Sequence, residues 1–191
     1  MRPRRAARRC FFLLVLLQAT FALELPQARA AGTEADSLEY GVKAAYLYKL
    51  GDYVEWPAAA FDSPTSPVQI CIAGADPFGG SLDATVSGEH VKGRPIAIRK
   101  LRLVERNSGC HIVYFGGSDQ QSASQGLALL QGTPVLTVTD AARNSDAAGI
   151  VHFVTKANRV RFDIDDQAAA QNGLTISSKL FGIAASVKLR K

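Results

Sequence analysis

The chain has 191 residues, of which 47% are hydrophobic, and a formal net charge of +5. This length and composition suit one domain of ordinary size with its own hydrophobic core. Six arginines and one acid lie within the first 30 residues, and the rest of the chain holds equal numbers of basic and acidic side chains. The positive charge therefore gives no argument for binding to nucleic acid.

The first 30 residues have the pattern of an export signal. The basic segment MRPRRAARR precedes the apolar run CFFLLVLLQATFAL, and Ala28-Arg29-Ala30 matches a small-residue cleavage site. The apolar run is shorter than the roughly 20 residues that a membrane-spanning helix needs. We predict that residues 1–30 are a signal peptide cleaved near Ala31, and that residues 31–191 form a single domain in the periplasm. The pair Arg8-Arg9 leaves both the general and the twin-arginine export routes open.

The first half of the mature chain alternates between helical and strand patterns. A helix is predicted from a capping box at Asp36 and Glu39 to a stop at Pro57. Short apolar runs bounded by turn residues predict four strands, VQICIAG, GRPIAIRKL, CHIVYFGG and PVLTVTD. Asp76 is expected to cap a helix after the first of these strands, and Ser118 a helix after the third.

The last third of the chain predicts a hairpin and two further helices. GIVHFVTKANRVRFDID reads as two strands joined around Lys156-Ala157-Asn158, and DQAAAQNG as a short helix capped by Asp165 or Asp166. SSKLFGIAASVKLRK has the spacing of a closing helix. The whole order predicts an α/β fold: a three-layer sandwich with a mostly parallel central sheet and a C-terminal antiparallel hairpin.

Cys110 and His111 stand together at the head of an apolar run, which raises the question of a catalytic pair. Neighbouring residues of a strand point to opposite faces, so the two cannot act as nucleophile and base. The other histidines lack the spacing of zinc ligands, and Cys-x-x-Cys is absent. We therefore predict no catalytic residue, metal or cofactor. Instead, the even pair Cys71 and Cys110 predicts a structural disulfide in an exported protein.

Small and polar residues follow several of the predicted strands. They are Gly74, Asp76, Gly116, Ser118 and Asp140. Ligands of α/β proteins bind where parallel strands end, although no P-loop or dinucleotide-binding glycine pattern is present. Tight turns and helix caps explain the same residues more simply. A periplasmic small-molecule-binding protein or enzyme that uses these loops is the alternative function.

The first predicted helix is the most aromatic segment of the chain. Its broad apolar stripe contains Val42, Ala45, Tyr46, Tyr53 and Trp56. Tyr48 falls outside that stripe, beside Asp52 and Glu55. Because exposed aromatic side chains are frequent anchors of protein interfaces, we predict that Tyr48 stays exposed. With Asp52 and Glu55, it is expected to take part in a dimer or partner contact.

Several segments, in this order, carry a resemblance to known proteins: VKAAYLYKLGDYVEWP, ICIAGADPFG, GRPIAIRKL, GCHIVYFGGS, VLTVTDA, GIVHFV with RVRFDID, and AAAQNGLTISSKL. Together they cover nearly all of residues 39–182. They resemble the YfiR family of periplasmic proteins. Members of that family have a cysteine pair at positions matching Cys71 and Cys110, whereas this chain has no second pair after Val138.

The resemblance implies a regulatory binding module and no enzyme. Such a module forms a homodimer and holds an inner-membrane diguanylate cyclase of the YfiN type inactive from the periplasmic side. It is itself sequestered by an OmpA-like outer-membrane lipoprotein of the YfiB type. By this resemblance the protein would repress cyclic di-GMP signalling and biofilm formation.

Overall fold

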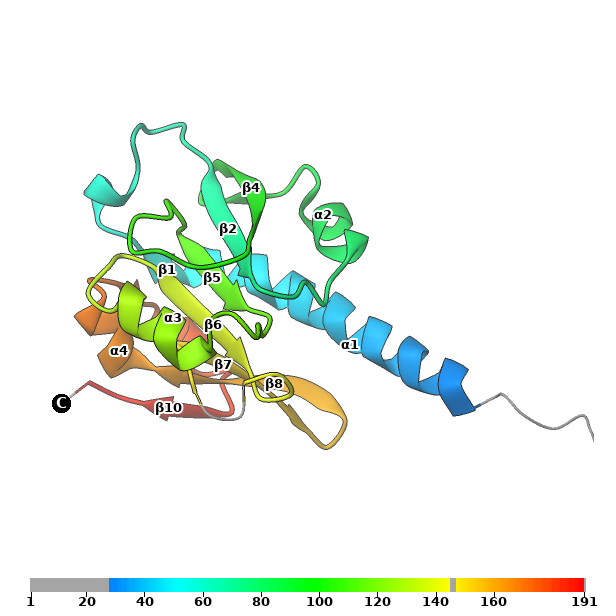
Figure 1. Cartoon of the computed structure of the whole chain (residues 1–191). Coiled ribbons are helices and arrows are strands. Elements are labelled where there is room, and N and C mark those ends of the chain that lie inside the picture. Colours follow the sequence, from blue (N-terminus) through cyan, green and yellow to red (C-terminus); the bar gives the residue numbers. More distant parts are fainter. Residues whose placement is uncertain (1–27, 145–146, 191) are drawn as a thin grey trace, which may run out of the picture. The chain divides into compact units, whose positions relative to one another are not determined.

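The computed structural model describes residues 28–144 and 147–190 (Figure 1). The chain divides into two units, Met1–Asp36 and Ser37–Lys191. The described part of the first unit is the beginning of helix α1 (Ala28–Lys49). Residues 1–27, which contain most of the predicted signal peptide, lie outside the described residues. The second unit contains the remainder of α1, the other helices and all described strands.

An eight-stranded, mostly parallel sheet lies at the centre of the second unit. Its strands, in spatial order, are β10 (Ser186–Lys188), β8 (Arg159–Asp165), β7 (Val151–Lys156), β6 (Leu136–Asp140), β5 (Ile112–Phe115), β2 (Val68–Ala73), β4 (Arg94–Leu101) and β3 (His90–Val91). Strands β7, β6, β5, β2 and β4 are parallel, whereas β8 and β3 pair antiparallel with β7 and β4. The predicted α/β fold, with a mostly parallel sheet and a C-terminal antiparallel hairpin, is confirmed.

Helices cover both faces of this sheet, and the part of α1 in the second unit and α3 (Ala123–Leu130) lie on opposite sides of it (Figure 1). Alternate residues of the strands face two separate cores. The larger core contains Ile70, Ile72 and Tyr114 together with side chains from α1, α2 (Gly80–Val86), α4 (Asp166–Gln171) and α5 (Ser178–Phe181). The smaller core contains Cys71, Val113 and side chains from α3. Strands buried on both faces explain why these segments read as continuous apolar runs.

Helix α1 differs from its predicted bounds at both ends. Asp36 lies inside the helix, and Glu39 pairs with Lys43 rather than completing a capping box. The helix ends at Lys49 and gives way to a 3-10 turn, η1 (Leu50–Tyr53), and to strand β1 (Val54–Glu55), which pairs with β9 (Thr175–Ile176). Gly51 in this turn approaches β3 so closely that a Cβ there would lie 2.7 Å from Val91. Tertiary packing therefore ends the helix before Pro57.

Two predicted helix caps belong to other residues. Asp76 accepts the N–H of Phe78 in a turn, and α2 begins only at Gly80. Ser118 likewise stabilises a turn, whereas Ser122 caps α3 in a reciprocal capping box with Gln125. A Ser and a Gln three residues apart satisfy two backbone donors at once, which favours the later start.

The C-terminal region contains a strand where a helix was predicted. The hairpin of β7 and β8 is present and turns at Ala157 and Asn158, both with positive φ, and Asp165 caps α4 as predicted. However, α5 spans one turn, and the chain then adds β10 to the edge of the sheet, parallel to β8. Arg190 fixes this end through two hydrogen bonds to Asp166, and these bonds hold the pKa of the Asp166 carboxyl below its usual value. Pairing with a distant strand outweighs the helical spacing here.

Candidate functional site

A shallow groove of about 720 Å³ lies at the carboxyl edge of the sheet, where β4, β2, β5 and β6 end. The loops that follow these four strands line it with residues 74–75, 102, 116–120 and 142–143. Gly74, Gly116 and Ser118, which the sequence singled out, thus lie together. This groove is called the strand-end groove below.

Two glycines allow the loops of the strand-end groove to pack directly against each other. A Cβ on Gly74, which has a φ of +83°, would lie 2.3 Å from the carbonyl oxygen of Gly117. A Cβ on Gly116 would lie 1.7 Å from the carbonyl oxygen of Ala75. No other residue fits either position without moving backbone, because real Cβ atoms do not approach so closely. The floor of the groove is therefore bare backbone.

The two aspartates predicted beside these glycines have other roles. Asp76 forms an ion pair with Lys100, 2.7 Å from its Nζ, in addition to capping its turn. Asp140 is buried at the end of β6 and does not line the groove. The structure thus separates the five candidate ligand residues into three that line the groove and two whose carboxylates are engaged by lysines.

Asp140 is the centre of a buried polar network that the sequence did not reveal. Its Oδ2 accepts hydrogen bonds from Lys43 Nζ at 2.6 Å and from the Tyr114 hydroxyl at 3.0 Å. Lys43 also pairs with Glu39, at 2.5 Å. Burial lowers the pKa of Lys43, but the hydrogen bonds to Asp140 and Glu39 outweigh it, and the pKa is raised overall. Burial beside Asp140 also raises the pKa of Tyr114. The network joins α1 to the end of β6 with its charges compensated.

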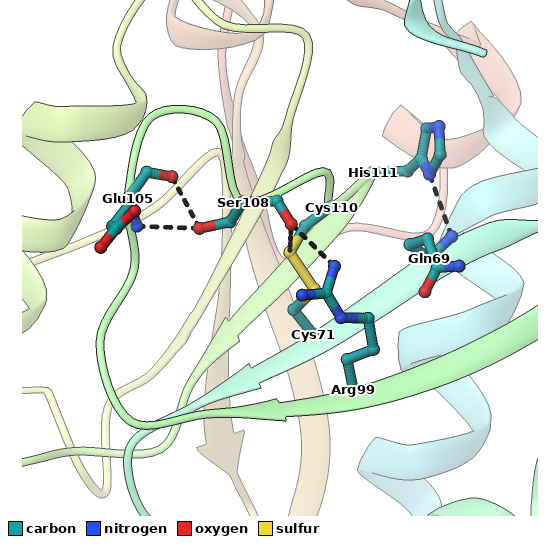
Figure 2. Close-up of a disulfide and its surroundings, with 7 residues drawn as sticks. All are labelled: Gln69, Cys71, Arg99, Glu105, Ser108, Cys110 and His111. Carbon is teal, nitrogen blue, oxygen red and sulfur yellow. Dashed lines mark hydrogen bonds between the residues drawn. A yellow bond between two sulfur atoms is a disulfide. The ribbon is translucent and has the colours of Figure 1, made fainter. Parts of the chain in front are cut away.

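Cys71 and Cys110 form a disulfide, with their Cα atoms 5.9 Å apart (Figure 2). Cys71 lies in β2, and Cys110 lies two residues before the adjacent strand β5. Both are buried in the smaller core. Nearby, Arg99 donates a hydrogen bond of 2.8 Å to the carbonyl of Ser108. The disulfide therefore occupies the place of an apolar core pair on the face that α3 covers.

His111 points away from the sulfur atoms and toward the larger core (Figure 2). Its Nδ1 accepts the backbone N–H of Gln69, so its Nε2 carries the proton and donates to the carbonyl of Ala60, each at 2.9 Å. The ring stacks on Phe61. Burial is the main reason why the pKa of His111 is lowered. The side chains of Cys110 and His111 thus lie on opposite faces of the sheet. The neutral imidazole of His111 holds the 57–67 segment against the sheet through its contacts with Ala60 and Phe61.

The predicted exposure of Tyr48 is wrong. Its side chain is only 5% exposed and lies in the larger core, because α1 buries the side of the helix that carries Lys43, Ala44, Leu47 and Tyr48. Asp52 and Glu55 are exposed, and both contact Lys92 in the turn between β3 and β4, Asp52 at its backbone N–H and Glu55 at its ammonium. The two acids therefore share a surface from which Tyr48 is absent.

The exposed side of α1 carries apolar residues instead. Leu38 is 71% and Val42 is 47% exposed, and they line a shallow hollow of about 460 Å³ with Ser37, Gly41, Ala45, Tyr46 and Lys49. These seven residues are called the α1 apolar face below. The spacing of Leu38, Val42 and Ala45 was visible in the sequence. Because Lys43 on the other side is buried, the sequence pattern did not indicate which side of the helix faces the core.

The described ranges, 28–144 and 147–190, contain no helix long and apolar enough to cross a membrane. Within the same ranges no three His, Cys, Asp or Glu side chains are grouped so that they could hold a metal ion.

Comparison with known proteins identifies the family of the chain. The profile of the family described as YfiR/HmsC-like matches residues 40–185, which is most of the chain and includes Lys43, Tyr114 and Asp140 of the buried network, the disulfide and the strand-end groove. The match suggests a regulator of cyclic di-GMP signalling in the periplasm. The search of curated proteins finds no match. On the strength of the profile match, the chain belongs to the YfiR/HmsC-like family.

Proposed function

We propose that the protein is a periplasmic repressor that binds an inner-membrane diguanylate cyclase of the YfiN type. By holding the cyclase inactive, it lowers cellular cyclic di-GMP and limits biofilm formation. The observation that carries the proposal is the family match over residues 40–185. The repressor acts by binding and catalyses no reaction.

Export and assembly follow from the same proposal. Residues 1–30 are removed as a signal peptide, and the mature single domain begins near Ala31 in the periplasm. The Cys71–Cys110 disulfide suits that oxidising compartment. The mature protein forms a homodimer, and an OmpA-like lipoprotein of the YfiB type sequesters it and thereby releases the cyclase.

We place the contact with the cyclase on the α1 apolar face. Contiguous exposed apolar surface on a soluble protein usually marks an interaction site. At Gly41 an added Cβ would meet no atom within 4 Å, so a partner side chain can reach the helix backbone there. Lys49 at the rim provides a cation that complements an acidic side chain of the cyclase.

Gene deletion and complementation test the proposal in a strain that retains the partner cyclase. Deletion should raise cyclic di-GMP and surface attachment, and the wild-type gene should restore both. A Leu38→Asp/Val42→Asp variant should fold normally but fail to restore them. Leu129→Asp is the matched control, because Leu129 is an exposed leucine on α3, across the sheet.

The outcomes test repression of the cyclase and the placement of the contact on the α1 apolar face separately. Unchanged cyclic di-GMP after deletion would refute repression of the cyclase. Full complementation by the α1 variant, after deletion has raised cyclic di-GMP, would refute only the placement of the contact. Pull-down of the full-length cyclase by the wild-type protein and by Leu129→Asp, but not by the α1 variant, would support both.

A further inference from the structure

The strand-end groove lies at a point where the chain leaves the sheet in two directions. After β2 the chain forms α2, whose Leu82 and Val86 join the larger core. After the adjacent strand β5 it forms α3, whose Leu130 joins the smaller core on the other face. In open α/β sheets such divergence of neighbouring loops opens a crevice outside the carboxyl ends of the strands, which is where ligands bind.

Two arginines, in the loops that follow two different strands, give this crevice a positive charge. Arg102 follows β4 and Arg143 follows β6, so they reach the groove from either side of β2 and β5. Asp119 is the single acid among the described lining residues. The neighbouring carboxylates of Asp76 and Asp140 are already paired with Lys100 and Lys43. The groove therefore has an excess of cationic hydrogen-bond donors, which favours an anion.

One of these arginines is already fixed in position. Arg143 Nε donates to the Tyr40 hydroxyl at 2.8 Å, and its guanidinium lies 5.2 Å from the centre of the Tyr40 ring. Its Nη1 also contacts the carbonyl oxygen of Gly116, at 3.4 Å. A side chain that is ordered before binding loses less conformational entropy when the ligand arrives.

The floor of the groove can be approached closely. Gly117 has a φ of +86°, and a Cβ there would meet no atom nearer than 4.0 Å. The space above its Cα is therefore open to a ligand, and backbone N–H groups in glycine turns of this kind are common donors to phosphate and carboxylate oxygens.

We propose that the strand-end groove binds a small ligand bearing a phosphate or carboxylate group, held by Arg102 and Arg143 over the Gly117 turn. This site is separate from the α1 apolar face, and its ligand is independent of the partner cyclase. Tyr40, which orders Arg143, lies on α1, so the ligand site is in direct contact with the helix that carries the proposed partner surface.

The test uses the purified mature protein with inorganic phosphate and with malonate as probes, at ionic strength held constant with sodium chloride. Saturable shifts of the Gly74, Gly117 and Ser118 amide signals in NMR spectra are expected. Arg102→Gln should weaken binding about tenfold, the size of a lost charge-assisted hydrogen bond. Arg159→Gln, an exposed arginine on β8, is the matched control and should bind as the wild type does.

Arg102 is exposed, so its substitution leaves the fold intact and keeps the test decisive. A preference for phosphate over malonate would assign a phosphate-bearing ligand, and the reverse preference a carboxylate. Shifts that grow in proportion to the probe concentration without saturating would overturn the proposal. Equal affinity of Arg102→Gln and the wild type would overturn it as well, whatever the result for the cyclase.

Discussion

The ammonium of Lys43 lies 2.6 Å from the carboxylate of Asp140, and neither side chain is more than 1% exposed. The two residues are 97 positions apart in the chain. Tyr114 and Glu39 supply further hydrogen bonds to the pair. A charged pair at this depth is stable because each partner compensates the other, and it fixes the orientation of α1 on the sheet.

Lys43→Met should therefore destabilise the protein strongly. It would leave the Asp140 carboxylate buried beside Tyr114 without a cation, at a cost of about 3–5 kcal/mol in the free energy of unfolding. Urea denaturation followed by circular dichroism measures this loss. Lys49→Met, at an exposed position of the same helix, is the control and should change little. If the double variant Lys43→Met/Asp140→Leu is no more stable than Lys43→Met, the uncompensated charge is not the cause.

Removing the disulfide should cost about 4 kcal/mol in the free energy of unfolding. Cys71 and Cys110 are 39 residues apart, and a cross-link closing a loop of that length lowers the entropy of the unfolded chain by this amount in the chain model. Cys71→Ala/Cys110→Ala can be compared with the oxidised wild type in guanidinium denaturation. Reduced wild type is the second reference, and it should behave like the double variant. A double variant as stable as the oxidised protein would contradict the prediction.

Tyr48→Ala should destabilise the protein by about 3–5 kcal/mol, the usual loss for a large aromatic side chain in a core. The sequence had predicted an exposed residue, whose loss would leave the melting temperature unchanged. Differential scanning calorimetry distinguishes a lowered melting temperature of Tyr48→Ala from an unchanged one. Val42→Ala on the exposed side of α1 provides the comparison, and a similar melting temperature for both variants would place Tyr48 outside the core.

Stability should fall as the pH drops below about 6.5, the ordinary pKa of histidine. Burial is the main cause of the lowered pKa values of both His111 and His152. The unfolded chain therefore binds protons at a higher pH than the folded protein. The contribution of the two histidines to the free energy of unfolding is complete above their pKa in the unfolded chain. It is lost as the pH falls toward their lower pKa in the folded protein.

Replacing one of these histidines should reduce the pH dependence of the melting temperature. His111→Gln can retain a donor toward Ala60 and an acceptor toward Gln69 but does not titrate. Its melting temperature should fall less steeply than that of the wild type between about pH 7.5 and 5.5. His90→Gln, at an exposed position, is the control. An unaltered slope in His111→Gln would exclude the imidazole as the titrating group.

The strands of the inner sheet were predictable because burial on both faces leaves a simple signature. β5 and β6 are buried along their whole length, and their sequences are apolar or threonine-rich runs between turn residues. The hairpin of β7 and β8 was equally clear, because Ala157-Asn158 separates two patterned runs. The sequence within and beside each of these strands determines it, so these strands can be predicted from short segments alone.

The errors arise where a distant contact decides the outcome. Lys43 reads as a surface residue until Asp140 is placed beside it, so the buried side of α1 and the position of Tyr48 were assigned wrongly. β10 forms only because the edge of β8 accepts it. In the strand-end groove, the glycines could be selected from the sequence. Arg102 and Arg143 could not, since they approach the groove from two strands whose order in the sheet the sequence does not give.

The long separation between Lys43 and Asp140 also governs the order of events during synthesis. A growing chain presents the lysine of α1 before its carboxylate partner, 97 residues later, has been translated, and β8 is made before the strand β10 that pairs with it. Contacts of such separation can form only after the residues between the two partners have been made. The Lys43–Asp140 pair therefore cannot hold α1 on the sheet until β6 has been made, and until then α1 stays accessible to chaperones and proteases.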